Sequence, residues 1–278
     1  MRPNLIVIGA AKCGTTSLHR YLDAHPAIAM SKEKELSFFV EEKNWSRGFA
    51  WYEGQFDSNA PVRGESSTTY SAFPLWRGVP ERIAQVVPDA KLVYCVRDPI
   101  ERIVSHYAHR TVNWPEMGTL EETLADAHLR EWLVTPSRYW LQLEQYLAHF
   151  PADRILVLDS DELRASTQTA LARVFDFVGV DPSFRSREFA RPHNVAQGRT
   201  RQNRVGRTAS SLLAVTLGSS RSRRIRERAP QALKSPFRAK LPSPVLTRTL
   251  REELEAELRG DVERLRTHTG LAFAGWSI

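Results

Sequence analysis

The sequence predicts an α/β domain in which a central parallel sheet is covered by helices on both faces. Short apolar runs recur at about residues 4–9, 62–65, 91–96 and 155–158, and each is bounded by polar or turn residues, as β-strands are. The segments between these runs place apolar residues at helical spacing. Because strands that alternate with helices form parallel sheets, both faces should be buried. With 278 residues, 42% of them hydrophobic, the chain can bury a full core.

The first strand runs directly into a loop of small residues and then a helix start. Gly9 and Gly14 have the spacing of the nucleotide-binding loop G-x-x-x-x-G-K-[ST], but Thr15 stands in the place of the lysine and Lys12 lies inside the loop. Backbone N–H groups at a helix N-terminus attract any phosphate-like anion, whereas the usual lysine serves the β- and γ-phosphates of a triphosphate. The loop therefore predicts a binding site for an anion that is shorter than the triphosphate of ATP.

The helices are predicted from apolar residues that share one face. The helix after the glycine loop carries Leu18, Tyr21 and Leu22 on such a face. Two later sets follow the same rule: Leu171, Val174, Phe175 and Val178, and then Leu246, Leu250, Leu254, Leu258 and Val262 in the last helix.

The strand at about 91–96 is followed by a second group of polar residues. Arg97 comes directly after it, Pro99 opens a helix, and Ser105 lies two turns further on. Ligands of parallel sheets bind beyond the carboxyl ends of the strands, so Arg97 and the glycine loop should share one edge. There the guanidinium and the Ser105 hydroxyl could bind a second phosphate. Taken alone, Arg97 is better explained by an ion pair with Asp98 or Glu101.

Together these motifs resemble those of sulfotransferases that use 3′-phosphoadenosine 5′-phosphosulfate (PAPS). Gly9 to Leu18 is similar to their 5′-phosphosulfate loop, and Arg97-Asp98-Pro99 through Ser105 is similar to their 3′-phosphate motif. Further segments resemble the branch that contains heparan sulfate and bacterial carbohydrate sulfotransferases: 35–39, 51–52, 64–66, 79–82, 139–147 and 269–276. The resemblance covers nearly the whole chain and is weakest at 199–240.

The resemblance implies a fold, a co-substrate and a set of contacts. The fold is a three-layer sandwich of the P-loop nucleotide-kinase type, formed by residues 1–278 as a single domain. The co-substrate is PAPS, and Lys12 would offset the charge that builds on its leaving phosphate. No metal is expected in the chemical step, because Lys12, helix amides and Arg97 supply a positive field. The implied nucleotide contacts are Lys12, Cys13, Gly14, Thr15, Thr16, Ser17, Arg97, Ser105 and Arg199.

Glu35 is the candidate general base. In the branch that the chain resembles, the acceptor proton is taken by a glutamate just before an apolar residue, a variable polar residue and a Phe-Phe pair, and Glu35 alone matches that position. Desolvation by the phenylalanines is expected to bring its basicity nearer to working pH. The pattern alone would make Glu35 part of a solvated run of alternating Lys and Glu. His106 and His109 are alternative bases, although both are more typical of packing or helix-surface histidines.

The chain departs from the resembling branch beside Glu65. Heparan sulfate enzymes usually have a lysine after this glutamate, which serves catalysis and acidic-sugar binding there, and this chain has Ser66. Ser37 likewise stands where a histidine is expected. An acidic glycan acceptor is therefore not favoured. Glu65 could orient Lys12, face the acceptor, or form a buried structural pair.

Basic residues are concentrated between 199 and 240. This segment holds twelve lysines and arginines and only Glu227 as an acid, a charge of +11 in a chain of net charge +7, so the remainder is mildly acidic. It could form a mobile lid, a peripheral membrane contact through 205–228, or a face for an acidic acceptor. A solvated, partly disordered insertion explains it equally well.

Three readings of the whole chain compete. A PAPS-dependent sulfotransferase is favoured over an ATP-dependent P-loop kinase because Thr15 replaces the motif lysine. A nucleic-acid-binding protein is disfavoured because the basic segment has Phe237 as its one aromatic residue. The acceptor is expected to be a hydroxyl on a carbohydrate, a lipid-linked molecule or a small natural product, with Trp45, Trp51, Tyr52, Trp114 and Trp132 as candidate stacking residues. Two cysteines and no visible targeting segment suggest a cytoplasmic location.

Overall fold

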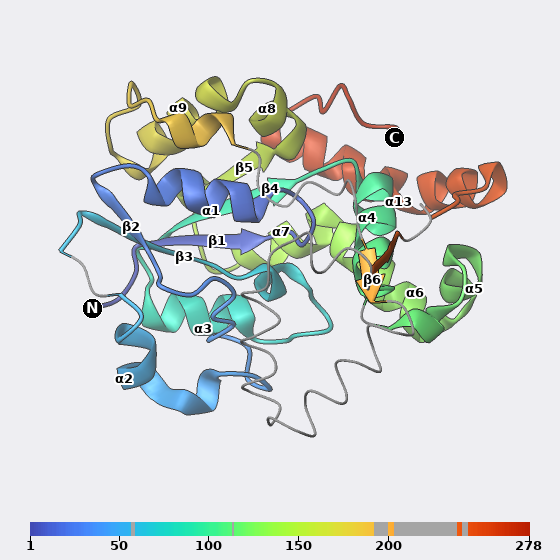
Figure 1. Cartoon of the computed structure of the whole chain (residues 1–278). Helices are drawn as coiled ribbons and strands as arrows, with labels where there is room; N and C mark the ends of the chain where they lie inside the picture. The colour runs from blue at the N-terminus through green and yellow to red at the C-terminus, as the bar shows by residue number, and fades with distance from the viewer. Residues whose placement is uncertain (57–58, 113, 192–199, 203–237, 241–243) are drawn as a thin grey trace.

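The computed structural model describes residues 1–56, 59–112, 114–191, 200–202, 238–240 and 244–278. It confirms the predicted α/β architecture, because five parallel strands form one sheet in the order β2-β3-β1-β4-β5 (Figure 1). The strands are β1 (Leu5–Gly9), β2 (Ile28–Met30), β3 (Val62–Ser66), β4 (Lys91–Val96) and β5 (Ile155–Asp159).

Four of the strands lie within one residue of their predicted bounds, and β2 was not predicted. It has only three residues, too few to show an alternating pattern. Pairing with β3, in the register Ile28↔Val62, makes this short segment a strand. The tertiary partner, which the local sequence does not contain, decides the conformation here.

Helices cover both faces of the sheet. Figure 1 shows α1 and α9 above the sheet and α3 below it. The chain just after α7 lies on the side of α3, where His149 Nε2 is 3.6 Å from Glu81 Oε1. The helices are α1 (Thr15–Asp23), α2 (Gly48–Glu53), α3 (Val79–Val86), α4 (Pro99–Arg110), α5 (Leu120–Ala125), α6 (Ala127–Val134), α7 (Tyr139–Leu147), α8 (Ser160–Ala165), α9 (Thr167–Val178) and α13 (Arg248–Thr269).

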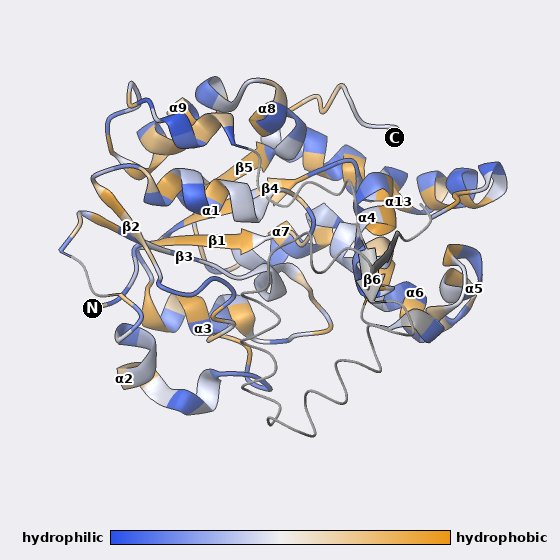
Figure 2. Cartoon of the chain, viewed as in Figure 1, coloured by the Kyte–Doolittle hydropathy of each residue, from blue (hydrophilic) through white to orange (hydrophobic). Residues whose placement is uncertain are grey.

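The main hydrophobic core surrounds the sheet. All five residues of β1 are buried, and Figure 2 shows the strands as an apolar centre between amphipathic helices. A second apolar cluster joins α4, α5, α6 and α13, and includes Ile100, Ile103, Leu120, Leu133, Leu254 and Leu258. The predicted face of the last helix is buried from Leu250 to Val262, but Leu246 precedes the helix, which Thr247 caps by accepting a hydrogen bond from the Leu250 N–H (3.3 Å).

The ends of the basic segment meet in a small second sheet. β6 (Thr200–Gln202) pairs antiparallel with β7 (Arg238–Lys240). The rest of the predicted lid or insertion, including Arg199 and the whole of the predicted membrane contact 205–228, lies outside the described residues. Among the residues that the structure describes, none of the helices combines the length and apolar composition that a membrane crossing requires.

The topology brings four loops to one edge of the sheet. Because the strands are parallel, the loops after β2, β3, β1 and β4 all leave from the same edge, in that spatial order. These loops carry Glu35, Thr68, Lys12 and Arg97 respectively. Three of the predicted functional residues, Lys12, Glu35 and Arg97, therefore share one side of the molecule.

Candidate active site

The glycine loop ends in a helix N-terminus that can bind an anion. Helix α1 begins at Thr15, and its first internal hydrogen bond runs from the Leu18 N–H to the Gly14 carbonyl (3.1 Å). The N–H groups of the first turn are therefore outside the helix's own bonding pattern. Lys12 and Gly14 have left-handed φ values of 74° and 79°. This geometry is that of a backbone cradle for a phosphate-like group.

Gly9 is required by close packing between two of the loops. A Cβ at Gly9 would lie 1.8 Å from Ser71 Oγ, and the φ of Gly9 is 151°. Ser71 belongs to η2 (Thr68–Ser71), the turn that follows β3. The glycine thus lets the β1 loop rest directly on the β3 turn.

Cys13 faces the protein interior. Its side chain is fully buried, and burial raises the pKa of the thiol to about 11. Its Sγ lies 3.6 Å from the Tyr139 hydroxyl, and its N–H donates to the Ala10 carbonyl (3.2 Å). The thiol and the backbone N–H of Cys13 are both engaged within the protein, so neither is assigned to the nucleotide below.

Arg97 lies at the carboxyl end of β4, next to the glycine loop. Its Nη2 donates to Glu101 Oε2 at 3.3 Å, so one of the two expected ion pairs is present. Asp98 instead caps α4: its Oδ1 accepts from the Glu101 N–H (2.8 Å) and its Oδ2 from the Ser277 N–H (2.5 Å). Ser105 is half-buried on the same helix. A weak, partly exposed ion pair leaves Arg97 able to bind a phosphate as well.

Glu35 is held at the edge of the sheet by the β3 turn. Its N–H donates to the Ser66 carbonyl (2.8 Å), and its Oε2 accepts from both the Thr68 N–H (2.7 Å) and Thr68 Oγ1 (3.1 Å). Its Oε1 forms an ion pair with Lys34. The Glu35 side chain is 38% exposed, so it is oriented from within and open to solvent.

The desolvated carboxyl group of this region is Glu65. The Phe38 and Phe39 rings are fully buried, and Phe38 stacks on Tyr52 with ring centroids 4.1 Å apart. The Tyr52 hydroxyl donates to Glu65 Oε1 (2.5 Å), and burial raises the pKa of Glu65 to about 7. Of the three interpretations of Glu65, the structure supports the buried one. The apolar surroundings that the Phe pair suggested for Glu35 are found at Glu65.

Of the two candidate histidine bases, His109 is exposed on α4 and His106 lies in unfavourable surroundings. Burial, with the charges of Arg102, Arg110 and Lys12, holds the pKa of His106 well below 6.5. Its Nδ1 lies 3.4 Å from Arg102 Nη1, and its Nε2 accepts from Arg110 Nε (3.3 Å). His106 is therefore a neutral packing residue, as expected for a helix histidine.

Position 66 has a polar partner that the sequence did not indicate. Ser66 Oγ lies 3.0 Å from His19 Nδ1, on α1. Burial and the charge of Lys34 lower the pKa of His19 to about 4. Lys34, at 19% side-chain exposure, thus lies close to both Glu35 and the Ser66–His19 pair. The sequence placed Lys34 in a solvated charge run and gave no signal for this role.

An aromatic cluster contacts Arg110, whose charge, like that of Glu35, acts on Lys43. The Arg110 guanidinium is 4.7 Å from the ring centroid of Trp114 and 4.1 Å from that of Trp132, and Trp114 is 43% exposed. Burial lowers the pKa of Lys43, while Glu35 raises it and Arg110 lowers it. Lys43 therefore lies within electrostatic range of both Glu35 and Arg110. Of the five predicted stacking residues, Tyr52 is buried in the core.

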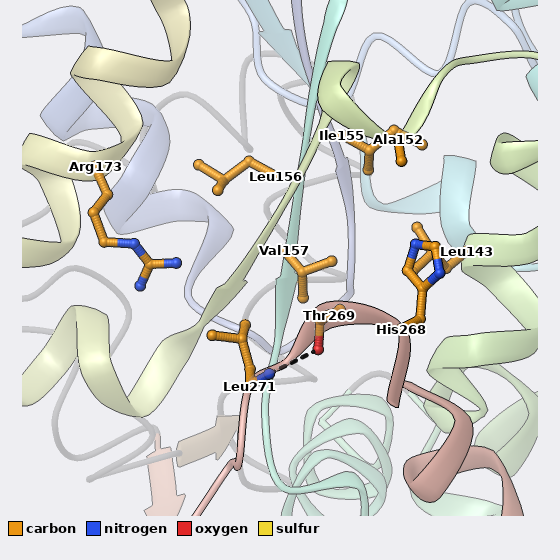
Figure 3. A pocket seen from close by; sticks show the side chains of 9 residues that line it. All are labelled: Leu143, Ala152, Ile155, Leu156, Val157, Arg173, His268, Thr269 and Leu271. Carbon is orange, nitrogen blue, oxygen red and sulfur yellow. Dashed lines mark hydrogen bonds between the residues drawn. The ribbon is translucent and has the colours of Figure 1, made fainter. Parts of the chain in front are cut away.

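A separate cavity of about 230 Å³ lies along β5 and the end of α13 (Figure 3). Its wall includes Val157, Arg173 and His268, and Thr269 Oγ1 accepts from the Leu271 N–H (3.3 Å). None of the predicted site residues lines it. The described part of the chain also holds no group of three or more His, Cys, Asp or Glu side chains placed to bind a metal ion.

The parallel sheet, with a glycine loop leading into the helix after its central strand, defines an α/β protein of the P-loop nucleotide-kinase type. A sequence profile described as "Sulfotransferase domain" matches residues 2–229, and the chain belongs to this family. The resemblance drawn from the two anion-binding motifs is thereby confirmed.

Several known proteins are similar to this chain. The bifunctional heparan sulfate N-deacetylase/N-sulfotransferase 1 of Caenorhabditis elegans is 30% identical over 182 residues, covering 61% of this chain and 21% of that protein. The mouse heparan sulfate glucosamine 3-O-sulfotransferase 5 is 28% identical over 191 residues, covering 65% and 54%. The chain thus spans about a fifth of the bifunctional relative. A sulfotransferase from Alicyclobacillus acidocaldarius has the same fold, with a TM-score of 0.71 at 23% identity and full coverage of both chains.

Proposed function

We propose that the protein transfers a sulfuryl group from PAPS to an acceptor hydroxyl, with Glu35 as general base and Lys12 stabilising the leaving phosphate. The observation that carries this proposal is the meeting of three elements at one sheet edge. These are a helix N-terminus with Lys12 in its loop, Arg97 at the end of the adjacent strand, and the oriented carboxylate of Glu35. Family membership supports the same reaction.

The residues present fit a donor with phosphates at two positions. The first turn of α1 and Lys12 would hold the 5′ end, with Thr15, Thr16 and Ser17 supplying hydroxyls. Ser160 Oγ, buried beside Gly14, has no hydrogen-bond partner among the described residues. Arg97 and Ser105 would hold the 3′-phosphate. This pairing of sites, together with Thr15 in the lysine position, favours PAPS over ATP.

The chain's own residues supply positioning, proton removal and charge. PAPS brings the sulfuryl group, which passes in line between two oxygens. Glu35 Oε1 would accept the proton of the acceptor hydroxyl, while Thr68 keeps Oε2 in place. The Lys12 ammonium would offset the charge that develops on the leaving phosphate, an effect worth about 3 kcal/mol for one well-placed donor.

For the acceptor we propose a hydroxyl on a carbohydrate, a lipid-linked molecule or a small natural product. The exposed Trp114, backed by Arg110 and Trp132, offers a planar surface on which a ring can stack. Lys43 links this surface electrostatically to Glu35. A panel of sugar, phenol and alcohol acceptors assayed with PAPS, on the wild type and on Trp114→Ala, tests this class. Equal turnover of ring and open-chain acceptors by both proteins would contradict it.

A binding and turnover experiment tests the reaction itself. Titrating the protein with adenosine 3′,5′-bisphosphate and with ATP should give tight binding of the bisphosphate and weak binding of ATP. Glu35→Gln should then abolish sulfuryl transfer while bisphosphate affinity is retained. Tight ATP binding without affinity for the bisphosphate would instead establish a kinase. Retained turnover in Glu35→Gln would end the case for this base.

A further inference from the structure

Glu65 is a fully buried carboxyl group that takes no part in the proposed reaction. Three hydroxyl groups converge on it. Tyr52 donates to Oε1 (2.5 Å), Ser67 donates to Oε2 (2.9 Å), and the Tyr70 hydroxyl lies 3.1 Å from each oxygen. Among the described residues no Lys, Arg or His forms an ion pair with it. Neutral O–H donors therefore stabilise this carboxylate, which is an uncommon and costly arrangement for a buried charge.

Two of these hydroxyls also hold the loop that carries Glu35. The Ser37 N–H donates to Ser67 Oγ (2.9 Å), and the Phe38 N–H donates to the Tyr70 hydroxyl (2.9 Å). Each hydroxyl is thus a bridge: its hydrogen points at Glu65 and its lone pairs accept from the loop. Among the described residues, the Tyr52 hydroxyl makes no hydrogen bond to the loop backbone and bonds only to Glu65.

The loop needs such bridges because its backbone is strained. Glu35 and Ser37 have φ values of 65° and 47°, in the left-handed region that side chains other than glycine rarely adopt. Residues in this region persist only where the surroundings determine them. The hydroxyls of Ser67 and Tyr70 hold the backbone directly after Glu35 in this conformation, because they accept hydrogen bonds from its N–H groups.

We propose that Glu65 is a positioning residue for Glu35, because its carboxylate directs the Ser67 and Tyr70 hydrogens inward and so keeps both hydroxyls as acceptors for the Glu35–Phe39 loop. This inference rests on the proposed role of Glu35 as the base. A hydroxyl has only one hydrogen to donate. Without the carboxylate, that hydrogen can turn toward the loop N–H groups and break the bridges.

Protonation of Glu65 should weaken the same bridges. A protonated carboxyl group donates its own hydrogen to one of the three hydroxyls, and one of the existing bonds then reverses. The titratable groups that face Glu65 are Tyr52, Tyr70 and Tyr146, whose pKa values burial raises well above 10, and Glu35. Because burial raises the pKa of Glu65 to about 7, kcat should rise as the pH increases through about 7.

The test compares Glu65→Gln with the wild type. Glutamine keeps the size of the side chain but turns one acceptor oxygen into an NH₂ donor. We expect kcat to fall about tenfold, the affinity for adenosine 3′,5′-bisphosphate to stay within about twofold, and the rise of kcat near pH 7 to disappear. An unchanged kcat together with an unchanged pH profile would overturn the inference.

A matched pair of tyrosine variants keeps the inference testable if Glu65→Gln folds poorly. Tyr70→Phe removes a hydroxyl that bridges Glu65 and the loop, whereas Tyr52→Phe removes one that contacts Glu65 alone. We expect about a tenfold loss of kcat in Tyr70→Phe and less than about threefold in Tyr52→Phe. Equal losses would reduce Glu65 to a structural residue. Failure of the proposed function would look different, since Glu35→Gln would then retain turnover.

Discussion

The stability of the protein should fall as Glu65 ionises, and Glu65→Gln should remove this dependence. Burial raises the pKa of Glu65 from its ordinary 4.5 to about 7. Between these values the native protein holds a proton that the unfolded chain has lost, so the free energy of unfolding decreases as the pH rises. The difference in pKa corresponds to about 3 kcal/mol in total, of which about 2.5 kcal/mol falls between pH 5 and pH 8.

Urea unfolding followed by tryptophan fluorescence measures this effect. The wild type, Glu65→Gln and the control Glu131→Gln, an exposed position on α6, are compared at pH 5 and pH 8. Titration of all other groups cancels in the difference between variant and wild type. The free energy of unfolding of Glu65→Gln, taken relative to the wild type, should be about 2.5 kcal/mol higher at pH 8 than at pH 5. The same relative value for Glu131→Gln should not change with pH. A gain below about 0.5 kcal/mol would refute the assigned burial of the charge.

Three further predictions concern the loops at the sheet edge. Lys12→Met should lower kcat by about a hundredfold or more, because the proposed contact between the ammonium and the leaving phosphate is lost, and Lys32→Met should not; steady-state assays with PAPS decide. Gly9→Ala should destabilise the protein by about 2 to 4 kcal/mol in thermal unfolding, since its Cβ would lie 1.8 Å from Ser71 Oγ, whereas Gly260→Ala, in open space on α13, should be neutral or stabilising. Thr68→Val keeps the backbone N–H to Glu35 Oε2 but removes the hydroxyl, and should lower kcat by about three- to tenfold; an unchanged kcat would show that the backbone bond alone orients the base.

The fold and the donor loops could be predicted from the sequence because their signals are local. The strand that ends at Gly9 and the helix that starts at Thr15 are adjacent in the chain, and the Arg97–Glu101 pair follows from its four-residue spacing. Strand β2 could not be predicted, because only its pairing with β3 defines it. The start of the last helix could not be predicted either. The periodicity of apolar residues assigns Leu246 to this helix, but Thr247 caps the helix, which therefore begins at Arg248.

The surroundings of the candidate base depend on contacts between residues that are far apart in the sequence. Glu35 is held by Thr68, 33 residues away, and Asp98 is bonded to Ser277, 179 residues away. The left-handed backbone at Glu35 and Ser37 could not be predicted, because neither residue is a glycine. Desolvation was expected at Glu35 from its neighbours in sequence, yet the sheet places Glu65 in that environment. The candidate acidic groups can thus be identified from residue types, but which of them is buried depends on the tertiary structure.

The dependence of Glu35 on the β3 turn has a consequence for redesigning the acceptor. The groups that orient the candidate base belong to residues 65–70, behind the loop that carries it, whereas the surface of Arg110, Trp114 and Trp132 runs from the end of α4 into α6. Grafting residues 110–132 from another family member would therefore exchange the proposed acceptor surface and leave Glu35 held by the β3 turn. The segment around Trp45 and Tyr52 offers no such freedom, since its rings pack on Phe38. Chimeras built on this division would change the proposed acceptor surface while the loop that carries Glu35 stays intact.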